Sequence, residues 1–470
     1  MRLQRSVGAA LVVVCSVLVG GGAAMARPYG FAGSASSRAL HSSPPTPASG
    51  VESVIYAFDR PGISSPTASV IFDSSGNLYG TAGQGGNGEP PSGICAVTGG
   101  CGGVFELSPN GSGYTEKTLY EFNGTADGAG PFAGLYMDAT GILYGTATYN
   151  GSTNCPLGCG TVFELVPFGS NYVEVTLYDF TGGTDGASPT GGLIADAQGN
   201  LYGTTQEGGD ANNDGTVFEL VRKSEKKYTE KILYRFHGCS EPSLSCDGAN
   251  PFAALYMDSS GRLFSTTTYG GKYQCPENNL CGTVFRLTPK GRGYKEDIIY
   301  YFQGGNDGAT SQGGLIADSS GALYGATVLG GGATYPPCDF ASVVRGCGVV
   351  FKLTPHGNTY KETLLHVFEG YSDGANPQAG VYADASGNLY GTTQLGGTQS
   401  GIGGCGTVFE LAKKGKQYQE KILYDFQGCS DSGGDATAPR AGVTEYGNAL
   451  FGTGFQGGGA GWGAVFRVNL

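Results

Sequence analysis

A repeating stretch of sequence constrains the fold of this chain more than any other feature. Residues 384–411, DASGNLYGTTQLGGTQSGIGGCGTVFEL, recur in shortened or varied form from one end to the other. The Leu-Tyr-Gly-Thr core of this stretch has seven copies, spaced about 60 residues apart. The aromatic residues of the copies are Tyr79, Tyr144, Tyr202, Phe264, Tyr324, Tyr390 and Phe451. Seven copies of one unit predict a single closed repeat array rather than a series of ordinary domains.

Two further markers accompany the cores in a constant order. A Val-Phe-x-Leu marker or a close variant follows every core, with its aromatic residue at Phe105, Phe163, Phe218, Phe285, Phe351, Phe409 and Phe466. An apolar-aromatic-x-Phe marker also occurs seven times, ending at Phe58, Phe122, Phe180, Phe236, Phe302, Phe368 and Phe426. The first copy of this last marker precedes every other marker in the chain.

Each unit divides into four short runs of β type, separated by turn residues. In the sixth unit these runs are Ala379–Asp384, Asn388–Thr393, Gly406–Leu411 and Tyr418–Phe426. After the first 26 residues no stretch sustains an apolar period of 3.6 residues, so we expect very little helix. Four antiparallel strands in each of seven units predict an all-β protein, a seven-bladed β-propeller.

The two ends of the repeat array predict how the ring closes. Val51–Phe58 carries the outer-strand marker without three inner strands of its own, whereas Ala441–Leu470 has three strands and no outer one. We therefore expect Val51–Phe58 to complete the last blade by pairing beside Ala464–Val468.

The many glycines and aromatic residues have a structural explanation in this fold. The 86 glycines include small-small-apolar runs, such as the one at residues 191–193, which suit the crowded strands nearest the axis. We expect bulky residues such as Tyr390, Phe409 and Phe426 to fill the widening gaps between blades. The aromatic residues are therefore expected in the core rather than on a sugar-stacking surface, and the chain has a single Trp.

The N-terminal region is predicted to be a secretory signal followed by a linker. Residues 1–26 combine Arg2 and Arg5, an apolar run, and a small-x-small cleavage site at residues 24–26. Residues 27–50, rich in Ser, Pro and Gly, are the predicted flexible lead-in, and residues 51–470 are the predicted propeller. We expect a secreted or extracellular protein, with the periplasm as the alternative location.

The charge of the chain argues against two classes of partner. The formal net charge is −12, and loss of Arg2 and Arg5 with the signal makes it more negative. An acidic surface disfavours nucleic acid and anionic membranes as partners. No segment after the signal approaches the roughly 20 apolar residues that a membrane span needs. We expect a monomer without a membrane span.

The cysteines predict a disulfide framework. Setting aside Cys15 in the signal leaves twelve, an even number in a chain expected to be secreted. Local spacing pairs Cys95 with Cys101, Cys155 with Cys159, Cys239 with Cys246, Cys275 with Cys281 and Cys338 with Cys347. The remaining Cys405 and Cys429 lie in loops expected on the same face, which makes them a sixth bridge. Zinc ligation is the alternative, and the variable spacing and lack of accompanying histidines argue against it.

The predicted blade topology separates two faces of the ring. The turns between the first and second strands, and between the third and fourth, are short and uniform, and they form what we call the hairpin face. The loops between the second and third strands, and the connectors between blades, carry the insertions and all twelve cysteines. We call the face that they form the loop face. Any localised function is expected there.

Five aspartates begin an Asp-Gly-Ala motif where the chain enters the innermost strand, on the loop face. They are Asp127, Asp185, Asp247, Asp307 and Asp373. A ring of carboxylates there could bind a cation or a basic ligand, so these residues are candidate ligand-binding residues. The alternative is a plain Asp-Gly turn between blades. It is favoured because the motif recurs from unit to unit instead of converging at one.

One loop resembles the first half of a calcium loop. Asp210, Asn212 and Asp214 place oxygen ligands at alternate positions before a Gly. They lie in the one complete unit whose second-to-third strand loop lacks cysteine, where calcium would replace a disulfide as a staple. Val221 stands where the bidentate Glu should fall, so an ordinary turn is the favoured interpretation. No other metal or cofactor is predicted.

No catalytic residues are predicted from the sequence. The four histidines, His41, His237, His356 and His366, are scattered along the chain. The chain has no nucleophile elbow, no His-Glu-x-x-His motif and no phosphate loop.

The units, with ADASGNLYGTTQLGG, CGTVFEL and EKILYDF, resemble the GloVer tandem repeat of bacterial exported proteins that are described by their choice of anchor. The resemblance covers about residues 51–470. It implies export and a repeat array, and no catalytic residues. This chain departs from the pattern in ending without an anchor, which favours release. The Asp-x-x-Gly-Asn-Leu-Tyr hairpin is also similar to hairpins of calcium-dependent lactonase propellers, whose Glu and Asn ligands have no clear counterpart here.

Two functions from different classes follow from these patterns. The preferred hypothesis is a non-enzymatic extracellular scaffold that binds a protein or glycan partner through the disulfide-rich loop face. It is preferred because no unit is singled out by convergent polar residues. The alternative is a metal-dependent hydrolase or lactonase-like enzyme with a divalent cation at the mouth of the ring.

Overall fold

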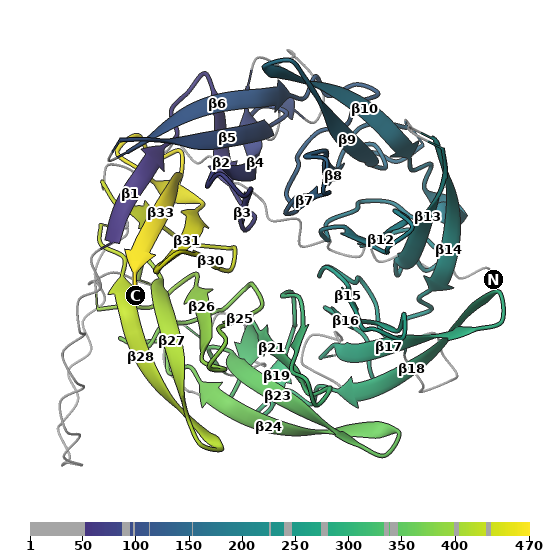
Figure 1. Cartoon of the computed structure of the whole chain (residues 1–470). Helices are drawn as coiled ribbons and strands as arrows, with labels where there is room; N and C mark the ends of the chain where they lie inside the picture. Colours follow the sequence, from purple (N-terminus) through teal and green to yellow (C-terminus); the bar gives the residue numbers. More distant parts are fainter. Residues whose placement is uncertain are drawn as a thin grey trace, which may run out of the picture. The chain divides into compact units, whose positions relative to one another are not determined.

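The chain folds into a ring of seven four-stranded antiparallel sheets, the seven-bladed β-propeller that the repeats predict (Figure 1). The computed structural model describes residues 52–86, 95–96, 99–111, 113–152, 154–224, 227–238, 247–273, 281–332, 338, 346–398, 404–428 and 434–470. The predicted signal and lead-in lie outside these residues, as do Cys239, Cys246, Cys275 and Cys429. Helix is almost absent from the described part of the chain, where η1 (Gly183–Asp185) is a 3-10 turn. Among the described residues no helix is long and apolar enough to cross a membrane.

The first four blades follow one another along the chain. Blade 1 contains β3 (Ile71–Phe72), β4 (Leu78–Gly85), β5 (Gly103–Asn110) and β6 (Gly113–Glu121), with β2 (Ile63–Pro66) as a further partner of β4. Blade 2 contains β7 (Tyr136–Met137), β8 (Leu143–Ala147), β9 (Thr161–Phe168) and β10 (Asn171–Asp179). Blade 3 contains β11 (Ile194–Ala195), β12 (Leu201–Thr205), β13 (Thr216–Ser224) and β14 (Lys227–Arg235). Blade 4 contains β15 (Tyr256–Met257), β16 (Leu263–Thr267), β17 (Thr283–Lys290) and β18 (Gly293–Tyr301).

The last three blades complete the ring. Blade 5 contains β20 (Ile316–Ala317), β21 (Leu323–Thr327), β23 (Val349–His356) and β24 (Thr359–Val367). Blade 6 contains β25 (Tyr382–Ala383), β26 (Leu389–Thr393), β27 (Thr407–Lys414) and β28 (Gln417–Asp425). Blade 7 contains β30 (Thr444–Tyr446), β31 (Ala449–Gly454), β33 (Ala464–Asn469) and β1 (Glu52–Ala57). Two small sheets pair β19 (Gly308–Ala309) with β22 (Leu329–Gly330), and β29 (Ala436–Thr437) with β32 (Gln456–Gly457).

The first strand closes the ring, as its orphan marker predicts. Strand β1 pairs antiparallel with β33, from Glu52 opposite Val468 to Ala57 opposite Ala464. A bulge lies between Val54 and Tyr56. The last blade is therefore built from both ends of the repeat array.

The innermost strands are shorter than the sequence predicts. The expected run Ala379–Asp384 is paired only over the two residues of β25, and the six other innermost strands are two or three residues long. The small residues before these strands instead approach neighbouring blades closely. A Cβ on Gly380 would lie 2.1 Å from the carbonyl oxygen of Gly314. Near the axis, close contacts with the neighbouring blade therefore replace hydrogen-bonded pairing within the blade.

Phenylalanine pairs form the core between blades. The ring that ends each outer-strand marker meets the ring of the Val-Phe marker in the next blade edge to face, with centroids 5.0–5.3 Å apart. All seven boundaries have such a pair: Phe58–Phe105, Phe122–Phe163, Phe180–Phe218, Phe236–Phe285, Phe302–Phe351, Phe368–Phe409 and Phe426–Phe466. These rings are almost fully buried. Edge-to-face packing adds a favourable quadrupole term to the apolar burial.

Substitution of Phe58 by Ala should destabilise the protein by about 3–5 kcal/mol, because it empties a buried site at the boundary that β1 closes. The matched control is Phe168→Ala at the tip of a hairpin, where the ring is 75% exposed and little change is expected. Denaturant unfolding of both variants measures the difference. Equal stabilities would show that the Phe58 contact does not hold the ring closed.

Candidate functional site: the loop face and the blade boundaries

Three of the predicted disulfides are present on the loop face. They are Cys95–Cys101, Cys155–Cys159 and Cys338–Cys347. Cys281 and Cys405 are also disulfide-bonded, and the partners predicted for them, Cys275 and Cys429, lie outside the described residues. The predicted Cys239–Cys246 pair lies outside them as well. Disulfides are typical of proteins in oxidising compartments outside the cytoplasm.

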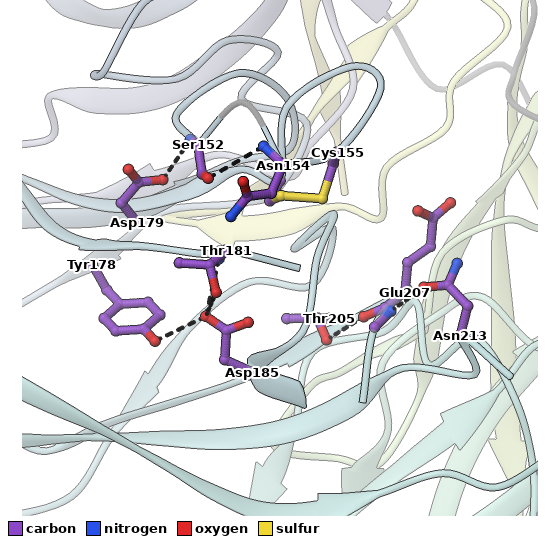
Figure 2. The surroundings of a disulfide bond; sticks show 12 residues. Ser152, Asn154, Cys155, Tyr178, Asp179, Thr181, Asp185, Thr205, Glu207 and Asn213 are labelled. Atoms are coloured by element: carbon purple, nitrogen blue, oxygen red, sulfur yellow. Dashed lines mark hydrogen bonds between the residues drawn. A yellow bond between two sulfur atoms is a disulfide. The ribbon is translucent and has the colours of Figure 1, made fainter. Parts of the chain in front are cut away.

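The disulfide loops contact the connector to the following blade. A Cβ on Gly182, in the connector to blade 3, would lie 2.8 Å from Cys155 Sγ. Figure 2 shows Cys155 together with Ser152 and Asn154 of its own loop and with Thr181 and Asp185 of that connector. A substitution that changed this loop would therefore also displace the entry to the next blade.

A backbone hydrogen bond repeats at this contact in every boundary. The N–H of Ser188, the residue after an Asp-Gly-Ala motif, donates to Cys159 O at 2.9 Å, and the corresponding donors elsewhere are Ser65, Gly130, Asn250, Thr310, Asn376 and Ala438. All seven donors have φ between 50° and 64°. Five of the acceptor carbonyls belong to disulfide-bonded cysteines, namely Cys101, Cys159, Cys281, Cys347 and Cys405. At these five boundaries a disulfide bridge therefore holds the residue whose carbonyl accepts the inter-blade hydrogen bond.

The structure places the five predicted aspartates beside the outermost strands, one at each of five blade boundaries. Tyr120 donates to Asp127 at 2.9 Å, and the corresponding pairs are Tyr178–Asp185, Tyr234–Asp247 and Tyr300–Asp307. At the fifth boundary His366 Nε2 lies 3.5 Å from Asp373. Each carboxylate also accepts a backbone N–H of its own connector, as Asp127 does from Asn123 at 2.8 Å. The five are therefore held singly between blades, and binding of a ligand by them stays a prediction.

A glutamate from the following blade completes each boundary, and sequence reasoning missed it. The outer strands share a Glu-x-x-x-Tyr pattern, or Glu-x-x-x-His in β24, whose acidic residues are Glu52, Glu116, Glu174, Glu230, Glu296, Glu362 and Glu420. In the best-defined case Tyr300 Oη lies 3.0 Å from Asp307 and 2.9 Å from Glu362. We call such a group, one Tyr or His with one Asp and the Glu of the next blade, a boundary triad.

Burial changes the protonation of the boundary glutamates. It raises the pKa of Glu230 to about 7 and those of Glu52, Glu296 and Glu362 to about 8, and the aspartate of the same triad adds to the effect. A neutral glutamic acid can share its proton with the neighbouring aspartate, whereas two ionised carboxylates would repel each other. The triads are therefore stable when each holds a proton.

One boundary differs from the other six in chemistry. His366 of β24 stands where six outer strands have Tyr, and its Nε2 lies 3.2 Å from Glu420 Oε1 as well as 3.5 Å from Asp373 Oδ2. Burial disfavours the imidazolium, but Asp373, Glu420 and Glu369 outweigh burial and raise the pKa of His366. Burial raises the pKa of Glu420 to about 7, opposed by His366. Comparing the seven outer strands position by position would have exposed this exception in the sequence.

The candidate calcium loop is held by a histidine. Asp210 Oδ2 lies 2.9 Å from His237 Nδ1, and Asn212 Nδ2 donates to His237 O at 3.1 Å. Burial raises the pKa of Asp214 to about 6, assisted by the nearby Asp210 and Asp247. The second-to-third strand loop of blade 3 has no cysteine, and these contacts with His237 join it to the connector that leads to blade 4. Calcium binding by these residues stays a prediction.

Comparison with known families agrees with the repeat pattern. The family profile described as the Gloeobacter/Verrucomicrobia repeat matches residues 44–276 and 339–470, more than half of the chain. No curated protein matches the sequence.

Solved structures share the fold at low identity. A fungal alcohol oxidase of the AA5 family, in complex with copper, is 14% identical with a TM-score of 0.50, over 90% of this chain and 76% of the oxidase. A Bacteroides uniformis protein assigned as a 6-phosphogluconolactonase is 10% identical, with a TM-score of 0.47 over 80% and 86% of the two chains. A PL25 ulvan lyase is 11% identical, with a TM-score of 0.45 over 88% and 96%. At these identities the likeness concerns the fold alone.

Thermal stability should be greatest at mildly acidic pH and fall as the pH rises from about 5 to about 9. The folded-state pKa values of Glu52, Glu230, Glu296 and Glu362 lie above the usual value of 4.5. Their stabilising contribution is complete below the pKa that a glutamate has in the unfolded chain, and it is lost as the pH rises through their folded-state pKa values of about 7 to 8. Melting temperatures across a pH series measure the effect.

The Glu296→Gln variant should flatten that profile, because its side chain stays neutral at every pH. Glu207→Gln, on the loop face but outside the boundary triads, is the matched control and should leave the slope unchanged. A melting temperature that rose between pH 5 and 9 would contradict the assignment of protons to the triads.

Proposed function

The chain belongs to the Gloeobacter/Verrucomicrobia repeat family, and we propose that it is a secreted, non-enzymatic scaffold that binds a protein or glycan partner on its loop face. The disulfides and the sequence features of residues 1–26 support export. The polar residues that recur in every unit support binding rather than catalysis, because they are occupied in joining one blade to the next.

The observation that carries this proposal is an apolar side chain presented by a disulfide loop. Leu157 is 42% exposed and lies between Cys155 and Cys159, which are bonded to each other. The backbone carbonyl of Leu157 accepts the N–H of Asn150 at 2.9 Å, which fixes the loop further. An exposed apolar group on a rigid support loses little conformational entropy when a partner covers it.

Two exposed tyrosines also lie on the loop face, in other blades. Tyr273 follows β16 in the second-to-third strand loop of blade 4, and Tyr371 lies in the connector from blade 5 to blade 6. They are 37% and 53% exposed. Tyrosine is enriched in protein interfaces, and its ring also packs against sugars, so both partner classes suit this surface.

Binding should depend on the loop face and not on the hairpin face. A triple variant, Leu157→Ser, Tyr273→Ser and Tyr371→Ser, should weaken binding about tenfold or more, because exposed apolar and aromatic anchors carry most of the binding energy. The matched control is Phe168→Ser with Val173→Ser, exposed apolar residues at a hairpin tip, which should change binding less than about twofold. Both are compared with the unmodified protein on an array of polysaccharides and purified envelope proteins, followed by titration of each hit.

The proposal fails if saturable binding is absent from the array, or if the control variant loses its hits while the loop-face variant keeps them. Melting curves of both variants establish that they are folded.

A further inference from the structure

We propose that His366, Asp373 and Glu420 bind one divalent transition-metal ion, Zn²⁺ by preference, between blades 5 and 6. The three residues come from β24, from the connector after it, and from β28. One ligand atom from each lies within 4.8 Å of the others. Imidazole nitrogen with two carboxylate oxygens is a ligand set that zinc accepts.

The separations of the ligand atoms suit a tetrahedral ion. His366 Nε2 lies 3.2 Å from Glu420 Oε1 and 3.5 Å from Asp373 Oδ2. Metal–ligand bonds of about 2.0–2.1 Å in a tetrahedral site place neighbouring ligand atoms about 3.3–3.4 Å apart. Two of the three separations therefore already match a tetrahedral ion, and the third pair of ligand atoms lies within 4.8 Å.

The cluster also lacks the hydrogen bonds expected of buried polar atoms. His366 Nε2, Asp373 Oδ1 and Glu420 Oε1 are shielded from solvent and have no hydrogen-bond partner within the described residues. Burying such atoms without partners costs free energy. Two of them, His366 Nε2 and Glu420 Oε1, lie 3.2 Å apart, and a single ion would satisfy both.

Neighbouring contacts orient the ligands for this role. The imidazole of His366 packs edge to face on Phe368, with centroids 4.6 Å apart. The backbone N–H of Glu369 donates to Asp373 Oδ2 at 2.8 Å, which holds that carboxylate in place. Hydrogen bonds and packing of this kind keep metal ligands in position.

The other boundaries show why the histidine matters. At the boundary of Tyr300, Asp307 and Glu362, burial and the two carboxylates raise the pKa of the phenol, so it stays neutral and donates its proton. A neutral phenol hydrogen-bonds the carboxylates but is a poor metal ligand. Only the boundary of His366 replaces this donor with a nitrogen ligand among the described outer strands.

The geometry favours a transition metal over calcium or magnesium. Calcium takes six to eight oxygen ligands, and magnesium prefers octahedral oxygen coordination. Here three protein ligands include a nitrogen, and a tetrahedral ion has one further position that a water molecule can take. Three protein ligands and one water are a common zinc arrangement.

The test titrates chelator-treated, full-length mature protein with Zn²⁺ in competition with a chromophoric chelator, and with Co²⁺ as a spectroscopic probe. We expect one equivalent of Zn²⁺, a visible Co²⁺ absorption of tetrahedral intensity, and a melting temperature that rises with added Zn²⁺. His366→Tyr, which reproduces the chemistry of the other boundaries, should lose all three signals while remaining folded.

Two further variants distinguish this site from the loop of Asp210 as the place where Zn²⁺ binds. Glu420→Gln, a nearly isosteric change, should weaken Zn²⁺ binding at least about tenfold even if His366→Tyr fails to fold. His237→Asn, which alters the loop of Asp210, should keep the full equivalent of Zn²⁺. The proposal is overturned if the unmodified protein binds no Zn²⁺ at micromolar concentration, if His366→Tyr and Glu420→Gln bind it as well as the unmodified protein does, or if His237→Asn abolishes it.

Discussion

The contact between neighbouring blades is the interaction on which the rest of this structure depends. A four-stranded sheet has two faces, and here one face packs against the preceding blade and the other against the following blade. Three kinds of contact recur there. Near the axis a buried hydroxyl reaches across, as Thr204 does to Ala253 O at 3.2 Å. Further out a pair of phenylalanine rings fills the gap, and at the rim a carboxyl pair meets a phenol. Apolar burial supplies most of the stability, and the polar contacts set the alignment.

The sequence predicts the ring of blades well and the polar contacts between blades poorly. The reason is that the blades follow from local patterns, whereas the polar contacts join residues far apart in the sequence. Strand periodicity and the order of markers are local, so the seven blades and the pairing of β1 with β33 follow from reading along the chain. The partnership of Tyr300 with Glu362 joins residues 62 positions apart. Glu362 stands at a half-buried position between the exposed Lys361 and Thr363, and a charged residue in such a run does not reveal its partner. The innermost strands are shorter than predicted because contacts at Gly313 and Gly380 come from other blades.

Because the units are so alike, a position at which one unit differs from the others is a candidate for a separate function. Six outer strands end in the same phenol chemistry, so a histidine at the seventh changes charge and ligand type without changing the backbone around it. The loop of Asp210 is a second departure. There the carbonyl of Asp214, not that of a bridged cysteine, accepts the inter-blade N–H of Asn250, and Asp210 contacts His237. In both places the backbone is that of the other units, and one or two side chains change the chemistry of the site.

The pairing of β1 with β33 has a consequence for how the chain matures. A ribosome makes Glu52 before the other strands and Val468 only after blades 1 to 6, so β1 is made long before its partner β33. Throughout that time β1 is an unsatisfied strand edge, open to chaperones or to the same edge of another nascent copy. Blades 1 to 6 can form one after another, but the ring closes only when β1 pairs with β33. Closure of the ring therefore depends on a strand that is made after blades 1 to 6.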